Sequence, residues 1–303
     1  MNISKFFILV LLINPVAYAQ QQADTGFQFN NPNPVYASVT GPRVCIDEGH
    51  HNFHTLDGRY LPFAQMVRED GYVVQAHQGL FTEQSLSVCE ILLIANALHA
   101  SNSNNWSYPH PSAFAAQEIQ ALILWVNAGG KLLLIADHAP FAGAAADLGA
   151  VSGLMMADIY AVHRRQGADV FMRNDNTLHD HAITQGRNTR ESIQNVTSFT
   201  GQAAMMTGDW QALLSFSAEA FAYINPQQAY QQQTTQVQGF SVSGWFQAAA
   251  REWGNGRMVF LGEAAMCSAQ TSGNGNPMGM NSPQAPQNAQ FCLNLVRWLS
   301  EDL

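Results

Sequence analysis

Charged side chains are scarce in this sequence. Asp, Glu, Lys and Arg together make up 12% of the 303 residues, about half of the share that is usual in globular proteins. There are 13 Lys and Arg residues against 22 Asp and Glu, which gives a formal net charge of −9 at pH 7. This balance argues against a protein that binds nucleic acid through its phosphates, because such binding depends on clustered basic residues.

Long apolar runs are missing beyond the first twenty residues. The opening stretch has one basic residue, Lys5, an apolar segment over 6–16, and then Ala17-Tyr18-Ala19. This pattern predicts a signal peptide over 1–19 with cleavage after Ala19, since its apolar part is too short to span a bilayer. We therefore expect an exported protein, periplasmic or secreted, without a membrane span.

The mature chain is expected to begin with a leader and continue as one domain. Residues 20–40 are rich in Gln, Asn and Pro and have no apolar periodicity, which predicts a flexible leader. Hydrophobic residues make up 47% of the whole chain, enough for residues 41–303 to form a single domain around one core. A Gln-rich stretch at 227–238 predicts an exposed loop.

Cysteine is also rare. The four cysteines permit at most two disulfides, in three possible pairings. Cys45 and Cys89 lie within or beside apolar strands, where the simplest interpretation is a small buried apolar side chain. Cys267 and Cys292 flank a loop rich in Gly, Pro and Asn, and we predict a disulfide that closes this loop.

The chain does contain short apolar segments that alternate with helical patterns. Segments at 43–47, 72–76, 90–95 and 131–136 predict buried strands, and helical spacing of apolar residues occurs at 61–70, 112–127, 143–148 and 287–300. The turn Gly254-Asn255-Gly256 predicts a hairpin that leads into a strand at 257–262. This order predicts an α/β fold with a doubly wound, mostly parallel sheet, an added hairpin and long loops.

Polar side chains gather where the predicted strands end. The first strand is followed by Asp47, Glu48, His50, Asn52 and His54, the third by Asn96 and His99, the fourth by Asp137 and His138, and the hairpin strand by Glu263. The carboxyl ends of parallel strands lie on one edge of a sheet, where ligands of open α/β sheets bind, so we expect these side chains to converge. The candidate substrate-binding residues are Asn52, Asn96, His99 and, from a loop farther along the chain, His181.

Imidazole and carboxylate groups together suit zinc or a similar divalent cation. In that interpretation the metal ligands are His50, His54 and His138. The catalytic carboxylates, as base or as orienting groups, are Asp47, Glu48, Asp137 and Glu263. A metal-free acid/base pair, a His tuned by a nearby Asp, is the alternative. A structural alternative also stands, in which the Asp residues cap turns and the histidines are ordinary loop residues.

A covalent nucleophile is absent from the place where this fold would put it. After the third predicted strand the chain continues Ile94-Ala95-Asn96-Ala97-Leu98-His99. It lacks the Ser or Cys of a sharp strand-to-helix turn. Covalent acyl transfer is therefore disfavoured.

Several motifs, taken in their order along the chain, resemble the class I glutamine amidotransferase-like superfamily. They lie at 47–52, 125–130, 136–138, 181–184, 261–263 and 297–299. Over residues 42–303 the chain is similar to the DUF4350 and ThuA-like branch of exported bacterial proteins. The resemblance implies a flavodoxin-like sheet with its site at the carboxyl edge. Glutaminases of the superfamily use a Cys after the third strand, and its absence here means that glutaminase chemistry is not implied.

Two functions of different classes follow from these observations. The first is an exported hydrolase of a small or carbohydrate-like substrate, with or without a divalent metal that activates water. The second is a non-catalytic module that binds a sugar or a peptide in the same pocket. Few charges and six tryptophans suit a neutral ligand, since pockets combine aromatic walls with a few placed polar groups.

Overall fold

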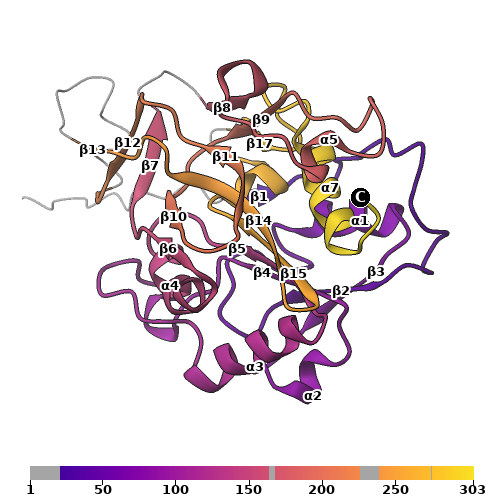
Figure 1. The fold of residues 1–303 in the computed structure, drawn as a ribbon, viewed down its shortest axis with the longest axis horizontal. Helices are drawn as coiled ribbons and strands as arrows, with labels where there is room; N and C mark the ends of the chain where they lie inside the picture. Colours follow the sequence, from indigo (N-terminus) through magenta and orange to yellow (C-terminus); the bar gives the residue numbers. More distant parts are fainter. Residues whose placement is uncertain (1–20, 164–167, 226–238, 274) are drawn as a thin grey trace, which may run out of the picture.

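A nine-stranded sheet is the main element of the computed structural model, which describes residues 21–163, 168–225, 239–273 and 275–303. Its strands follow the order β3-β2-β4-β5-β15-β14-β10-β6, with β11 paired to β14 (Figure 1). Their bounds are β2 (Arg43–Asp47), β3 (Val73–His77), β4 (Ile91–Ala95), β5 (Lys131–Ile135), β6 (Leu154–Met156), β10 (Ala204–Met206), β11 (Gln211–Ser215), β14 (Phe246–Trp253) and β15 (Gly256–Leu261). The predicted signal peptide over 1–19 and the Gln-rich loop at 227–238 lie outside the described residues.

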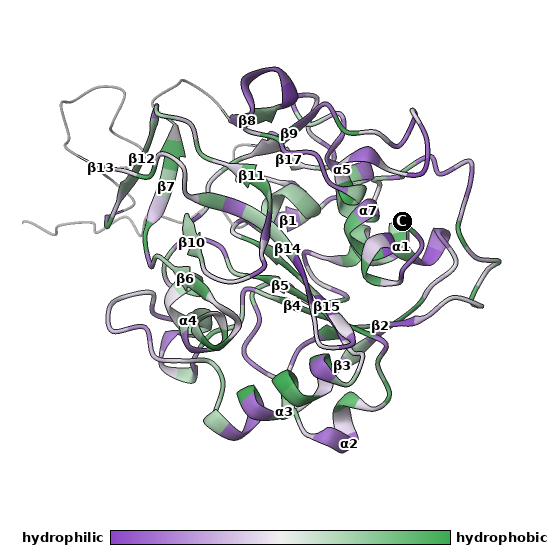
Figure 2. Ribbon diagram, viewed as in Figure 1, coloured by the Kyte–Doolittle hydropathy of each residue, from purple (hydrophilic) through white to green (hydrophobic). Residues whose placement is uncertain are grey.

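Five neighbouring strands of this sheet run parallel, namely β3, β2, β4, β5 and β15. Numbered along the chain, they follow the order 2-1-3-4-5, which is that of a flavodoxin-like, doubly wound sheet. Every residue of β4 is buried, as expected for a parallel strand that is covered on both faces, and the centre of the sheet around β4 and β5 is mostly hydrophobic (Figure 2). The prediction of a mostly parallel α/β sheet is confirmed.

The predicted hairpin is formed by β14 and β15. The two strands pair antiparallel from Trp253 and Gly256 onward. Gly254 has a φ of +60°, and a Cβ on it would lie 2.5 Å from Oδ1 of Asn127, so the turn requires glycine. Because β15 also pairs in parallel with β5, the residues that follow β15 lie at the carboxyl edge of the parallel strands.

Helices cover both faces of the sheet. The α1 (Leu61–Glu69) and α7 (Asn288–Leu299) helices pack on one face, and α2 (Glu83–Leu86), α3 (Ala116–Asn127) and α4 (Phe141–Ser152) on the other. The α3 helix begins four residues later than the predicted 112–127, and α2 was not predicted. Within the described ranges, no helix has both the length and the apolar character needed to cross a membrane.

The remaining elements are short and lie mostly in the middle of the chain. Three strands, β1 (Gln22–Ala23), β16 (Ala269–Thr271) and β17 (Pro277–Gly279), form one small sheet. A second is formed by β7 (Tyr160–His163), β12 (Ala220–Tyr223) and β13 (Phe240–Ser241), and a third by β8 (Asp169–Met172) and β9 (Asn195–Ser198). The other helices among the described residues are α5 (Ala182–Gln185) and the 3₁₀ turns η1 (Ala100–Asn102), η2 (Arg173–Asp175) and η3 (Ala265–Cys267).

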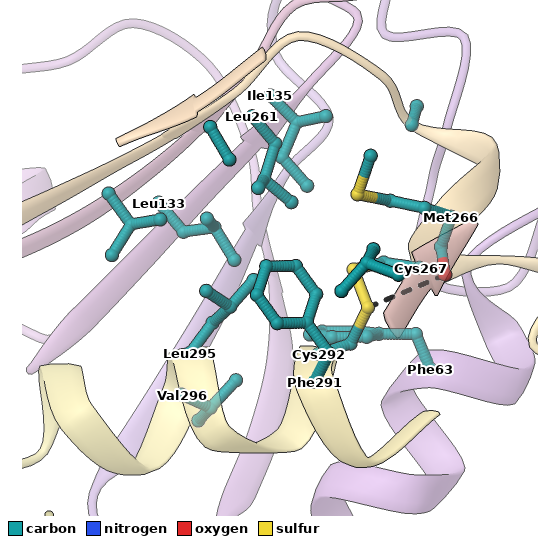
Figure 3. Close-up of a cluster of buried hydrophobic side chains, with 14 of the residues drawn as sticks. Phe63, Leu133, Ile135, Leu261, Met266, Cys267, Phe291, Cys292, Leu295 and Val296 are labelled. Carbon is teal, nitrogen blue, oxygen red and sulfur yellow. Dashed lines mark hydrogen bonds between the residues drawn. A yellow bond between two sulfur atoms is a disulfide. The ribbon is translucent and has the colours of Figure 1, made fainter. Parts of the chain in front are cut away.

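Both pairs of cysteines form disulfides. The predicted bridge between Cys267 and Cys292 is present and ties η3 to α7 inside the core (Figure 3). The interpretation of the other pair as buried apolar side chains was wrong, because Cys45 and Cys89 are also bridged. Cys45 lies on β2 and Cys89 just before the neighbouring strand β4, and this adjacency brings their Cα atoms to 5.8 Å. The sequence alone does not show which strands are neighbours.

The stretch predicted as a flexible leader has fixed partners where the structure describes it. The ring of Tyr36 packs edge-on against Tyr72, and its hydroxyl donates to Asp302 over 2.6 Å. The fully buried guanidinium of Arg297 pairs with Asp70 at 2.7 Å, and the same carboxylate accepts hydrogen bonds from leader residues. These contacts join residues that are far apart in sequence, which a local lack of periodicity does not reveal. A single domain over 41–303 stays a prediction.

Candidate functional site

Most of the predicted site residues lie at the carboxyl edge of the parallel strands. Asp47 ends β2, Asn96 follows β4, and Asp137 lies two residues beyond β5. Glu263 lies at the same edge because β15 runs parallel to β5. All four side chains are buried, so the edge holds an internal polar layer rather than an open row of catalytic groups.

His50 is held between two carboxylates. Its Nδ1 lies 2.9 Å from Oδ2 of Asp47, and its Nε2 lies 2.9 Å from Oε1 of Glu118. The ring also packs on Phe81 and Phe114, with centroids 4.4 and 4.9 Å away. Burial lowers the pKa of His50, but the hydrogen bonds and charges of the two carboxylates outweigh burial, so the pKa is raised. The geometry is that of a buried imidazolium with both ring protons in use.

The other predicted residues of this loop are also engaged in holding it. Asn52 donates to Oδ2 of Asp47 over 2.9 Å and accepts from the backbone N–H of His50. Glu48 accepts from the backbone N–H of Leu56 and from the side chain of Gln78. Glu48 and Asn52 therefore help to hold the loop in place, and their catalytic and substrate-binding roles stay predictions.

Asp137 and Glu263 form a buried carboxylate pair. Asp137 is 7% exposed and Glu263 is 1% exposed. Burial raises the pKa of Glu263 well above its ordinary range, and the nearby charge of Asp137 adds to this effect. Burial also raises the pKa of Asp137. Each carboxyl group accepts backbone N–H bonds, Asp137 from His138 and Ala264, and Glu263 from the first residues of η3. The shifts favour a proton within this pair.

Asn96 joins the buried pair to His54. Its Oδ1 accepts from the backbone N–H of Asp137 over 2.9 Å, and its Nδ2 lies 3.3 Å from Nδ1 of His54. Asn96 has a φ of +53°, a conformation that Asn tolerates better than most residues. Burial, with the charge of Arg59, lowers the pKa of His54 to about 3, so this ring is neutral. Its Nε2 is buried without a hydrogen-bond partner among the described residues.

An aromatic cluster, which we call the aromatic ledge, lies beside this polar layer. It consists of Trp106, Phe53, Phe141 and His138. Trp106 is 42% exposed, and its ring packs edge-to-face on Phe53 and Phe141 with centroids 5.3 and 5.1 Å away. The ring of His138 lies 6.3 Å from that of Trp106. The ledge thus presents a partly exposed indole whose ring packs on the two phenylalanine rings.

His138 is the half-buried member of the ledge that has a titratable side chain. Its ring stacks on Tyr160 with centroids 4.4 Å apart. Its Nδ1 lies 2.7 Å from the carbonyl oxygen of Ala139, which requires Nδ1 to donate and leaves Nε2 as the acceptor of the neutral ring. That Nε2 lies 3.9 Å from Oδ1 of Asp137. His138 therefore links the ledge to the buried carboxylates.

A metal site does not emerge from the predicted ligands. No group of three or more His, Cys, Asp or Glu side chains in the described parts of the chain is placed to hold a metal ion. Both ring nitrogens of His50 face carboxylates, and Nδ1 of His138 faces a backbone carbonyl. These donors do not fit zinc as one set with His54, and we derive no step through a metal.

Two predicted substrate-binding histidines have other partners. His99 caps η1 by accepting the backbone N–H of Ser101 at Nδ1 over 3.2 Å. His181 caps α5, and its ring packs on Trp298 with centroids 5.2 Å apart. Burial and the charge of Arg257 lower the pKa of His181 to about 4. Arg257 lies opposite Lys131 in the register of β15 and β5, at the amino ends of both strands. Because His181 is close enough to Arg257 to feel its charge, His181 lies away from the carboxyl edge.

The sequence did not single out Glu118 or Trp106. Glu118 occupies the third position of α3, where its Oε2 accepts the backbone N–H of Ala115 over 3.0 Å. A Glu at this position of a predicted helix signals a cap, but it does not reveal the second bond to His50. Trp106 lies in a polar loop rich in Ser and Asn, where an isolated large aromatic residue was the available signal.

A surface groove of about 510 Å³ lies between α3 and α4. Apolar side chains, among them Ile119, Leu124 and Val151, form most of its wall. None of the predicted site residues lines it. Ligand sites combine apolar walls with several orienting polar groups, and the carboxyl edge with its ledge fits that description better than this groove.

Comparisons with known proteins point to a fold and not to a family. No protein-family model matches the chain, and no curated protein matches it significantly. The solved structure of the mmIFT52 N-terminal domain is similar at a TM-score of 0.58 and 14% identity, over 85% of this chain and 97% of that one.

Two bacterial structures are similar at lower scores. A putative ThuA-like protein from Bacteroides uniformis ATCC 8492 has a TM-score of 0.47 and 12% identity, over 89% of this chain and 95% of that one. Cytoplasmic protein STM1381 from Salmonella typhimurium LT2 has a TM-score of 0.48 and 16% identity, over 86% of this chain and 97% of that one. At these identities the similarity to mmIFT52 concerns the fold alone, and the function has to be argued from the site.

Proposed function

We propose that this protein binds a small, neutral, carbohydrate-like ligand on the aromatic ledge. One observation carries the proposal: Trp106 is 42% exposed although its ring is held by Phe53 and Phe141. Single exposed apolar residues are common. Here, however, the exposed indole is packed on two other aromatic rings and lies beside His138, a hydrogen-bond acceptor. Such a surface suits a ligand that has an apolar ring face with polar groups around its edge. A sugar ring has that shape.

The chemistry around the ledge suits a neutral ligand. Arg59, the cation over the ring of Phe53 at 3.8 Å, donates to the carbonyl of Phe53. In the neutral form of His138, Nδ1 donates to the carbonyl of Ala139 and Nε2 can accept a hydrogen bond from a sugar hydroxyl. The carboxylates of Asp137 and Glu263 are buried and accept backbone N–H bonds, so a cationic ligand would not reach them.

Calorimetric titration with methyl glucoside, maltose, cellobiose and xylobiose tests the proposal. We expect at least one probe to bind and Trp106→Ala to weaken it by about tenfold or more, because aromatic anchors dominate binding energy. Phe240→Ala is the matched control, since Phe240 is a similarly exposed aromatic residue, at 44%, on β13. No binding by any probe, or equal losses in both variants, contradicts the proposal.

Hydrolysis is the second candidate, and the buried pair of Asp137 and Glu263 favours it. Burial raises the pKa of both carboxyl groups, which favours the protonated form that a general acid requires. The pair is closed to substrate, so His138 is the group that would contact it, with Nε2 as a general base toward water. This version needs neither a covalent nucleophile nor a metal step.

A turnover screen with p-nitrophenyl glycosides, p-nitrophenyl acetate and p-nitroanilide amides separates the two candidates. If the protein is a hydrolase, His138→Gln lowers kcat by about 100-fold or more. His51→Asn is the control, because His51 is exposed and Asn tolerates its φ of +47°. If a probe binds but is not turned over, only the binding function remains. Turnover that survives His138→Gln contradicts the role of His138 as a general base.

Export and family membership belong to the same proposal. The two disulfides are typical of oxidising compartments, which agrees with the signal pattern at 1–19. The motifs at 47–52 and 136–138 support membership of the DUF4350 and ThuA-like branch. Cell fractionation with thiol labelling tests export: the full-length protein in the cytoplasm with reactive thiols contradicts it.

A further inference from the structure

The loop between β4 and α3, which carries Trp106, is held by an internal amide. Asn102 is buried, and its Nδ2 donates to the carbonyl oxygens of Asn105, Ser107 and Pro109 over 3.0, 3.1 and 3.3 Å. These acceptors bracket Trp106 on both sides. The backbone around the exposed indole is therefore fixed from within its own loop.

His110 connects this loop to the rest of the protein. Its Nδ1 lies 2.7 Å from Oδ2 of Asp158, and its Nε2 lies 3.1 Å from the carbonyl oxygen of Trp106. Tyr108 stacks on the imidazole with centroids 4.0 Å apart. One imidazole thus ties the backbone of Trp106 to a carboxylate in a different segment of the chain.

Asp158 is anchored on the first turn of α4. Its Oδ1 accepts the backbone N–H of Gly143 over 3.1 Å, at the helix end that favours negative charge. A Cβ on Gly143 would lie 2.7 Å from Oδ2 of Asp158 and 2.8 Å from Cβ of His110. The glycine therefore allows the approach. The same helix turn begins with Phe141, the ring on which Trp106 packs.

We propose that His110 and Asp158 form a latch that positions Trp106 for ligand binding. The inference rests on the proposed function. Trp106 is 42% exposed, so packing of its ring against neighbouring side chains fixes its position only in part. An unlatched indole would have to be ordered when the ligand binds, and such ordering weakens affinity. Both residues are positioning residues, since they act on the ligand through Trp106.

Acrylamide quenching of Trp106 tests the latch without any ligand. Its emission is obtained as the difference between each protein and the same protein carrying Trp106→Phe. His110→Phe keeps the stack on Tyr108 but removes both hydrogen bonds, and Asp158→Asn replaces an acceptor oxygen with a donor. We expect both variants to increase the quenching of Trp106 and the hydrogen exchange of residues 103–110.

Ser103→Ala is the control in the same loop. The Ser103 hydroxyl donates to the carbonyl of Ala100 and accepts from the side chain of Asn104, and neither bond involves His110, Asp158 or Trp106, so this variant should change neither readout. Maltose, cellobiose and xylobiose then test the consequence, with affinity about five- to tenfold weaker in both latch variants. If quenching and exchange match those of Ser103→Ala while the probes still bind wild type, the latch is refuted alone. If no probe binds wild type, the proposed function fails, and the ligand-positioning role fails with it.

Discussion

Replacing His50 with Gln tests whether the imidazolium between Asp47 and Glu118 stabilises the fold. The substitution removes the positive charge that faces both buried carboxylates at 2.9 Å. Removing one partner of a buried ion pair costs about 3–5 kcal/mol, since it leaves a buried charge uncompensated. We expect a loss of about 3 kcal/mol, near the lower end, because each carboxylate keeps two other hydrogen-bond donors.

The loss should depend on pH in a direction fixed by His50. Burial lowers the pKa of His50, but its two carboxylate partners raise it by more than burial lowers it, so the pKa in the folded protein lies above that in the unfolded chain. The contribution of the imidazolium is therefore complete below the unfolded pKa, near 6.5, and is lost as the pH rises through the raised folded pKa. The difference in unfolding free energy between wild type and His50→Gln should be larger at pH 5.5 than at pH 8.5.

Urea unfolding followed by far-UV circular dichroism, with the disulfides intact, measures this difference. His51→Asn is the matched control, because His51 is exposed and has a φ of +47°, which Asn tolerates. The control should change the unfolding free energy by less than about 0.5 kcal/mol at either pH. A loss in His50→Gln that is equally small, or that is the same at pH 5.5 and pH 8.5, refutes the reasoning.

Three further outcomes follow from buried groups. Replacing both Cys267 and Cys292, which are 25 residues apart, with Ala should lower the unfolding free energy by about 3.5 kcal/mol; unchanged urea midpoints contradict this. Arg297→Met removes a fully buried guanidinium with two carboxylate partners and should cost about 3–5 kcal/mol, whereas the exposed Arg190→Met serves as a near-neutral control. The pKa of His54 is lowered to about 3, so its NMR signals should not titrate between pH 8 and pH 4. The stability that depends on this neutral ring should fall as the pH drops from 6.5 toward 3. An NMR titration midpoint near pH 6.5 contradicts the burial of this ring.

Strand positions were predictable from sequence where local composition decides them. The β4 segment is an unbroken apolar run, and every one of its residues is buried. This continuous apolar character predicts both a strand and its burial on both faces of the sheet. The hairpin turn at Gly254 followed from local chemistry as well. The disulfide between Cys45 and Cys89 was not predictable, because it depends on β2 lying beside β4, which is a property of the sheet order rather than of either segment.

The site was predictable as a location but not as a set of contacts. The parallel topology places Asp47, Asn96 and Asp137 on one edge, and each of them follows or ends a predicted strand. The second carboxylate partner of His50 is Glu118, 68 residues away. The proposed latch joins His110 to Asp158, 48 residues away. Polar pairs of this kind leave no periodic pattern, so the sequence contains the groups without indicating their pairing.

Accessibility decides which groups at the carboxyl edge meet a ligand first. To reach Glu263, a ligand would have to displace the backbone N–H groups of Ala265 and Met266, which lie 3.0 and 2.8 Å from its oxygens. That would open η3, which a disulfide ties to α7. Trp106 needs no such rearrangement, because its exposed surface is available while its backbone is fixed. Under the proposed function, a ligand would therefore meet the ledge first, and the buried carboxylates could act on it only through His138.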